Sequence, residues 1–146
     1  MSGAPGVAPA GTWTAGSLRR YFAHVKEEHS PHLDKPAEEV LSAYYQLQRQ
    51  AEGRNAVRTT IRLLQSLIRI AQAHARLCCR GVAGAGDAVV AVLLLENSMS
   101  TRALLGDSAV RVRDDFAADA DEAHDELVVT VLERLNLGHL LHRACS

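Results

Sequence analysis

The 146-residue sequence is poor in aromatic side chains, which make up 4% of it, and it has only three cysteines. Few aromatic residues, beside abundant alanine and leucine, argue against a sheet-based core and favour helices. Cys78 and Cys79 are adjacent and Cys145 lies near the end, so they offer neither an even disulfide framework nor paired metal-ligand spacing. We therefore expect free thiols in a reducing compartment, with Cys78 and Cys79 buried as small, inert side chains.

The sequence also lacks a long apolar run. The longest, Ala88 to Leu95, is far shorter than the roughly 20 residues that a membrane-spanning helix needs. Residues 1–16 are rich in Gly, Ala and Pro but lack the basic start and apolar centre of a secretory signal. A formal net charge of −1 argues against binding long DNA through the whole surface. We expect no membrane partner, a flexible leader over 1–12, and only a local site for anions.

Apolar residues recur at helical spacing over most of the chain, and capping residues mark where the helices begin and end. Asp34 can cap a helix whose first turn holds Pro36, and Gly53 follows its end. The pattern predicts an all-α fold, a small helical bundle. Its four expected helices cover about Thr14 to His29, Asp34 to Glu52, Thr59 or Thr60 to Gly81, and Asp87 to Met99.

The C-terminal third of the sequence has a different pattern. No period persists from Ser100 to about Asp115, although Ala103 to Gly106 is apolar enough to rest on the bundle. An acidic run from Asp114 to Glu126 then precedes an apolar helical pattern, and a short last helix follows. The acids suit a solvated helix start, and binding to a basic surface is the alternative. The expected division is a leader (1–12), a helical domain (13–100), a linker (101–116) and a C-terminal helical tail (117–146).

No acidic residue occurs between Arg54 and Gly86, although this stretch carries six arginines. Arg62, Arg69 and Arg76 are seven residues apart, so a helix aligns them on one face, with Arg58, Gln65 and Gln72 on the intervening turns. The opposite face is apolar. Its members are Ile61, Leu64, Leu67, Ile68, Ala71, Ala75 and Cys78. Guanidinium groups without intrahelical acids are suited to bind phosphate or carboxylate.

Other side chains that could carry chemistry have simpler interpretations. His74 is predicted to be a partly buried structural histidine, and Tyr44 and Tyr45 to be a core and a surface residue. His139, His142 and Cys145 are three apart, but no second pair of ligands completes a tetrahedral site, so we predict no metal. The glycine-rich segment from Gly81 to Gly86 lacks the lysine and hydroxyl of a phosphate loop.

The segments Tyr44-Tyr45-Gln46-Leu47-Gln48-Arg49-Gln50, Arg54 to Arg69 and Ala73 to Leu77 resemble the minichromosome maintenance helicases. The resemblance extends over about Trp13 to Leu141 and is closest to the branch formed by the family's ninth member. It implies that this chain is the C-terminal helical lid of an AAA+ ATPase, followed by a tail. The phosphate loop, magnesium-binding strand, arginine finger and DNA-contacting parts of the family have no counterpart here, so we expect a fragment that is inactive alone.

The resemblance also assigns roles to the arginine face. Arg62 matches the second-sensor arginine, a catalytic and ATP-binding residue that reaches the nucleotide phosphates, largely at a neighbouring subunit's site. Arg69 is a second, supporting cofactor-binding residue. ATP with magnesium would be bound mainly by the missing ATPase core. The implied partners are other helicase subunits in a ring and DNA, and the implied setting is replication and recombination repair in the nucleus.

Two departures from the family and two rival functions accompany this interpretation. Gln65 and Gln72 replace common glutamates, and Gly84 and Gly86 replace the usual capping residues, so the fourth helix is expected to start raggedly. The main rival function is a non-catalytic interaction module whose arginine face docks an acidic partner. A weaker rival is direct DNA binding by that face, which predicts a steep loss of affinity with salt.

Overall fold

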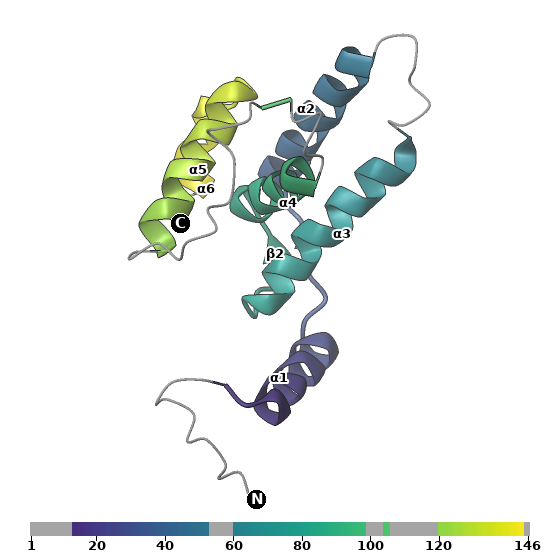
Figure 1. Cartoon of the computed structure of the whole chain (residues 1–146), viewed down its shortest axis with the longest axis vertical. Coiled ribbons are helices and arrows are strands. Elements are labelled where there is room, and N and C mark those ends of the chain that lie inside the picture. Colours follow the sequence, from purple (N-terminus) through teal and green to yellow (C-terminus); the bar gives the residue numbers. More distant parts are fainter. Residues whose placement is uncertain (1–12, 53–59, 99–103, 106–119, 145–146) are drawn as a thin grey trace, which may run out of the picture.

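The computed structural model describes residues 13–52, 60–98, 104–105 and 120–144, which form helices and one short pair of strands (Figure 1). The prediction of an all-α fold is confirmed. In chain order the elements are α1 (Ala15–Glu28), β1 (His32–Leu33), α2 (Lys35–Glu52), α3 (Ile61–Leu77), β2 (Val82–Ala83), α4 (Ala85–Ser98), α5 (Ala120–Arg134), the 3-10 helix η2 (Gly138–Leu140) and α6 (Leu141–Ala144). The expected leader (1–12), Arg54, Arg58 and most of the linker (101–116) lie outside the described residues.

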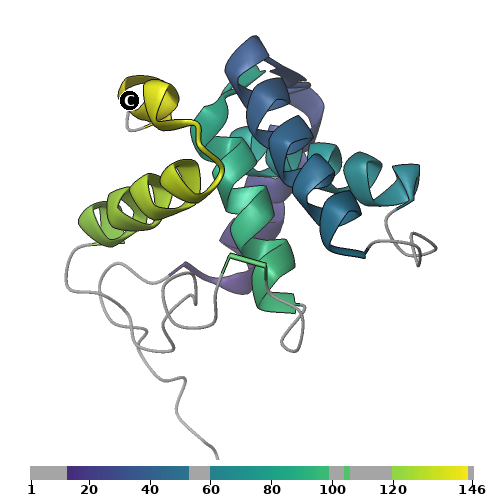
Figure 2. The ribbon, with the colours of Figure 1, turned by 90° about the horizontal axis from the view of Figure 1, so that it is seen from above.

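Helix α4 is the centre of the bundle. It lies between α2 and α3 on one side and α5 and α6 on the other in both views (Figures 1 and 2). A helix enclosed in this way must be apolar on several faces. The buried apolar residues of α4 include Ala88, Val89, Ala91, Val92 and Leu93. Residues of α2, α3 and α5 complete the same apolar cluster. Within the described part of the chain, no helix is long and apolar enough to cross a membrane.

The first two helices begin close to their predicted starts, and a capping side chain precedes each of them. Thr14 precedes α1, and its Oγ1 accepts a hydrogen bond from the Ser17 amide at 3.1 Å. Asp34 precedes α2, and its Oδ1 accepts one from the Ala37 amide at 2.8 Å. Each side chain satisfies an amide that has no partner within its helix, a contribution of about 1 kcal/mol.

Helix α3 ends at Leu77, before the predicted end at Gly81. Cys79 adopts a left-handed backbone with φ of 55°, and the Arg80 amide donates back to the Ala75 carbonyl at 2.9 Å. This turn closes the helix with a cysteine where glycine is usual. It also carries Cys78 and Cys79 to the surface, so the prediction that both thiols are buried was wrong.

The strand pair was not predicted from the sequence. His32 pairs with Val82 and Leu33 with Ala83 in a parallel register, and the Asp34 amide donates to the Ala83 carbonyl at 3.1 Å. Strands of two residues are too short to produce a period that sequence patterning can detect. Their pairing brings together the connections that lead into α2 and α4.

The segment after α4 returns to the core. Leu105 is buried, as expected for the apolar stretch that contains it, and its amide donates to Glu96 Oε2 at 2.9 Å. Val128, Val131 and Leu132 of α5 are also fully buried in the apolar cluster. The C-terminal helices therefore pack on α4.

Candidate functional site

Arg62 and Arg69 lie exposed on α3. Seven residues of α-helix separate them by roughly 10 Å along the axis and return them to nearly the same face. No described carboxylate pairs with either guanidinium group. Leu67 and Ala71, on the other side of α3, are fully buried. The helix is therefore fixed to the core by one face and presents these two cations on the other.

Arg62 lies in the first turn of α3, where a cation is electrostatically unfavourable because the helix dipole is positive at this end. The first turn holds no acidic residue that would offset it. Thr60 precedes the helix but its side chain makes no capping hydrogen bond. An anion placed here would be stabilised both by the guanidinium group and by the helix terminus.

The C-terminal part of the arginine face, at Gln72 and Arg76, is arranged differently. Gln72 donates from Nε2 to the Pro31 carbonyl at 3.0 Å, which ties α3 to the connection before β1. Arg76 is partly buried, and its Nε is buried without a hydrogen-bond partner among the described residues. Ile61 and Cys78, predicted on the apolar face, are instead exposed because they lie at the two ends of the helix. The predicted arginine face is therefore fully exposed at Arg62 and Arg69 but partly buried at Gln72 and Arg76.

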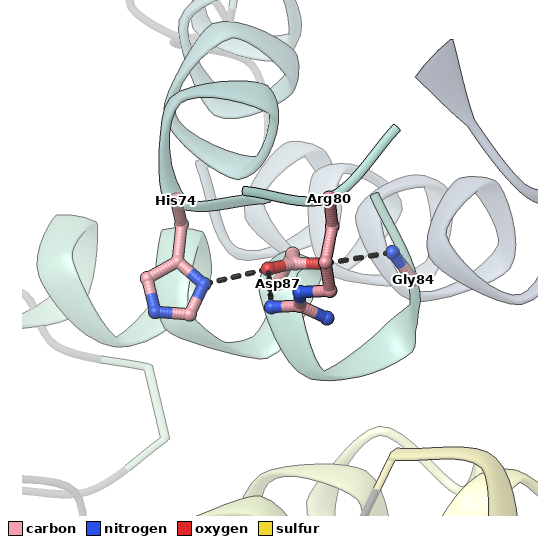
Figure 3. A network of polar contacts seen from close by, with 4 residues as sticks. All are labelled: His74, Arg80, Gly84 and Asp87. Atoms are coloured by element: carbon pink, nitrogen blue, oxygen red, sulfur yellow. Dashed lines mark hydrogen bonds and ion pairs between the residues drawn. The ribbon is translucent and has the colours of Figure 1, made fainter. Parts of the chain in front are cut away.

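Asp87 is fully buried and is the centre of a polar network (Figure 3). Its Oδ1 lies 2.6 Å from His74 Nδ1 and accepts from Arg80 Nη2 at 2.7 Å, and its Oδ2 accepts from the Gly84 amide at 2.8 Å. His74 is the partly buried structural residue that the sequence predicted. This network joins the end of α3 to the start of α4.

The same network corrects the expected ragged start of α4. Gly84 precedes the helix and Asp87 is its third residue, the position from which a carboxylate can reach back to the capping amide. Gly84 has no side chain to cap the helix, but the Asp87 carboxylate satisfies its amide instead. The three-residue spacing between Gly84 and Asp87 permits this contact. The absence of a capping hydroxyl at Gly84 nevertheless led to the prediction of a ragged start.

A second buried carboxylate, Glu96, holds three parts of the chain together. It accepts from the Tyr44 hydroxyl, from Gln48 Nε2 at 3.4 Å and from the Leu105 amide at 2.9 Å. Burial and the hydrogen bond to Glu96 raise the pKa of Tyr44 far above its ordinary value. Tyr44 is buried and Tyr45 partly exposed, as predicted. Glu96 was not identified from the sequence, because its place on an apolar helix gives no information about its partners.

A third polar contact connects α1 to the end of α3. The Tyr21 hydroxyl donates to the Leu77 carbonyl and lies 3.6 Å from Cys79 Sγ. The hydrogen bond with Cys79 raises the pKa of Tyr21, and burial adds to this effect. Trp13 packs edge-on against the Tyr21 ring, with centroids 5.1 Å apart.

The remaining candidates from the sequence are not brought to the arginines. His139 Nε2 lies 3.0 Å from Glu39 Oε1, and Cys145 is outside the described residues. No group of three metal-ligating side chains occurs in the part of the chain that the structure describes. Helix α5, which carries the described acids of the acidic run, lies across α4 from α3 (Figure 2), and none of these acids pairs with Arg62 or Arg69.

Comparison with known proteins adds a family match. Residues 16–99 match the family described as the MCM AAA-lid domain. The chain is 46% identical over 114 residues to a probable DNA helicase MCM9 of Oryza sativa subsp. indica, a match that covers 78% of this chain and 17% of the relative. The corresponding protein of Arabidopsis thaliana is 43% identical over 110 residues, covering 75% and 17%. The human DNA helicase MCM8 is 36% identical over 83 residues, covering 56% and 10%. The chain thus spans less than a fifth of the length of these relatives.

Proposed function

Because this chain belongs to the MCM AAA-lid domain family, we propose that it is the helical lid of an ATP-dependent DNA helicase subunit that works in a ring. In this proposal Arg62 reaches the phosphates of ATP at the site of a neighbouring subunit. Arg69, one heptad further along α3, supports it. The exposed position of both side chains, without a carboxylate partner among the described residues, is the observation that carries the proposal.

The physical argument rests on preorganisation. A guanidinium group held on a helix that is packed into a core needs little rearrangement to meet charge developing on a transferring phosphoryl group. Arginines that act in this way contribute roughly 10³-fold or more to phosphoryl transfer. Arg62 also lies at the end of α3 where the helix dipole favours an anion. The chain would thus supply one part of an ATP site.

Other parts of such a helicase would supply the rest. ATP with magnesium would be bound mainly by an ATPase core, and DNA by segments outside this chain. The relatives are named DNA helicases, and this supports a role on DNA. A setting in the nucleus, in replication and in repair by homologous recombination, is a further part of the proposal. The division into lid, linker and tail (13–100, 101–116, 117–146) belongs to the same proposal.

The test uses a chimera in which residues of this chain replace the aligned 114 residues of the full-length rice relative. Arg62→Ala is expected to lower ATP turnover of assembled rings by roughly 10²- to 10³-fold. Its circular dichroism and thermal midpoint should not change, because Arg62 is exposed.

Arg62→Lys keeps the charge but not the bidentate geometry and should remain strongly impaired. Arg19→Ala, at an exposed arginine of α1, is the matched control and should leave turnover unchanged. Equal turnover in Arg62→Ala and wild-type rings would refute the assignment.

Association measurements address the rival function. Isothermal titration of the chain against the ATPase core of the rice relative should detect binding that requires ATP and weakens in Arg62→Ala. Tight binding to an acidic partner without nucleotide would instead support an interaction module. Binding to DNA alone, with a steep salt dependence, would support direct DNA contact by the arginine face.

A further inference from the structure

Four exposed apolar side chains lie together where α1 meets the C-terminal end of α3. They are Trp13, Leu18, Phe22 and Leu77, and they are 40% to 60% exposed. Tyr21 joins them, because its ring lies 5.1 Å from the Trp13 ring and 6.3 Å from the Phe22 ring, between centroids, and its hydroxyl donates to the Leu77 carbonyl. Leu18 precedes Phe22 by one helical turn, so both lie on the same side of α1. These four side chains are called the α1 surface below.

The α1 surface is large for a chain with so few aromatic residues. Three of the six aromatic residues (one Trp, three Tyr and two Phe) lie in or beside it. Its four side chains leave roughly 300–400 Å² of apolar area in water, the size of the largest patch on a typical monomer. Helix α1 lies at the end of the molecule beside α3 (Figure 1), and Val25 is its one buried residue. The bundle therefore covers the apolar face of α1 only in part.

The α1 surface is bordered by cations. Arg19 precedes Phe22 by three residues and Lys26 follows it by four, so both side chains lie beside Phe22 on α1. Both are exposed, and no described carboxylate lies within ion-pair distance of either. Glu27 and Glu28, five and six residues after Phe22, fall on other sides of the helix. The border beside Phe22 is therefore positively charged.

The composition of the α1 surface favours a protein partner over other anionic partners. Two of its four side chains are leucines, which pack against other side chains but cannot stack on bases. Helix α1 has three basic and two acidic residues, a net charge of +1 (3 − 2), whereas anionic membranes and nucleic acids bind polybasic segments. An apolar surface with two cations at its border instead matches a single amphipathic helix that carries acids along its edge.

We infer that the α1 surface docks an acidic amphipathic helix of a partner protein. The apolar side chains of the partner would cover Leu18, Phe22 and Trp13, while two of its carboxylates, seven residues apart, would meet Arg19 and Lys26. Each pair of charges is then separated by roughly 10 Å along its helix, so both contacts can form at once. The α1 surface lies at the opposite end of α3 from Arg62, so this docking is independent of the proposed ATP site.

The chain contains its own reporter of this docking, because Trp13 is the single tryptophan. The probe is a helical peptide of about 18 residues with leucines on one face and glutamates beside them at heptad spacing. A matched peptide has lysine in place of each glutamate. At about 0.15 M salt, the glutamate peptide should shift Trp13 emission to shorter wavelength and saturate. The lysine peptide should bind at least about tenfold more weakly.

Variants of the chain separate the apolar contact from the charged one. Phe22→Ala should weaken binding of the glutamate peptide by roughly tenfold or more. Arg19→Glu combined with Lys26→Glu should reverse the preference, so that the lysine peptide binds more tightly than the glutamate peptide. These two side chains are exposed, so their replacement should leave the circular dichroism and the amide hydrogen exchange of residues 15–28 unchanged. Ile61→Ala, at an exposed apolar residue at the other end of α3, is the matched control and should bind as wild type does.

Several results would overturn the inference. Equal binding of the two peptides, or a preference that survives charge reversal, would show that the cations at the border do not select the partner. A dimer in sedimentation that Phe22→Ala abolishes would assign the surface to a second copy of the chain. A matching shift of Trp13 emission with phosphatidylserine vesicles or oligothymidylate would assign it to a membrane or to nucleic acid.

The same measurement on assembled rings tests whether the surface stays open in a whole subunit. A fluorescein-labelled glutamate peptide should bind rings of the chimera with the rice relative, detected by anisotropy, with an affinity similar to that for the chain alone. Binding to the chain but not to the rings would mean that the rest of the subunit covers the α1 surface, and the inference would be wrong.

Discussion

Replacement of Asp87 by alanine should destabilise the fold more than loss of either Thr14 or Asp34, the other side chains seen to cap a helix within the described residues. Asp87 is fully buried and accepts hydrogen bonds from Gly84, His74 and Arg80. Loss of the helix cap costs about 1 kcal/mol. The His74 and Arg80 side chains are 33% and 48% exposed, so water can partly replace Asp87, and each contact contributes about 1 kcal/mol after this screening. The expected loss in the free energy of unfolding is therefore about 3 kcal/mol.

Asp34→Ala is the matched control, because Asp34 also caps a helix. It accepts a single capping bond, from the Ala37 amide, so its loss should cost about 1 kcal/mol. Urea unfolding followed by circular dichroism measures both variants. With a slope of about 1–3 kcal/mol per molar urea, the Asp87 variant should unfold at roughly 1–3 M lower urea than wild type. If it is no less stable than the Asp34 variant, the network in Figure 3 contributes only a cap, and the reasoning fails.

Two further predictions concern other contacts of the core. The native state raises the pKa of Tyr44 above its unfolded value, so the folded protein holds this proton more tightly and stability should fall as pH rises above about 10. In a pH series of unfolding curves, Tyr44→Phe should make this alkaline slope shallower, although Glu96 also loses a hydrogen-bond partner; an unchanged slope would contradict the role of Tyr44. A Cβ on Gly86 would lie 2.9 Å from the Ala144 carbonyl oxygen, whereas one on Gly138 would meet nothing within 4 Å; Gly86→Ala should therefore lower the thermal midpoint by an amount equivalent to about 1–3 kcal/mol, and an unchanged midpoint beside that of Gly138→Ala would contradict the packing of α6 on α4.

Much of the helical framework could be predicted from local chemistry. Asp34 was predicted as a cap, and its contact spans only three residues, as does the contact of Thr14, so short-range spacing is enough to define such caps. The burial of Leu67 and Ala71 follows from the period of α3. These features depend only on residues that are neighbours along the chain, so local sequence patterns can predict them.

What could not be predicted depends on residues far apart in the chain. Glu96 contacts Tyr44 across 52 residues, and Tyr21 contacts Leu77 across 56. Neither pair has a spacing that a helix or strand would produce. The exposure of Cys79 also escaped prediction, because its left-handed backbone follows from the turn as a whole and residue type would favour glycine there. The roles of Arg62 and Arg69 come from resemblance and remain predictions.

The strand pair has a consequence for how the length of this domain can vary. β1 leads directly to Asp34 and β2 directly to Gly84, and both residues precede a helix that they help to begin. Inserting one residue into either connection would shift the parallel register and carry a helix start out of line with its neighbour. Two connections that resemble ordinary loops should therefore tolerate insertions and deletions poorly, and natural length variation should accumulate elsewhere in the chain.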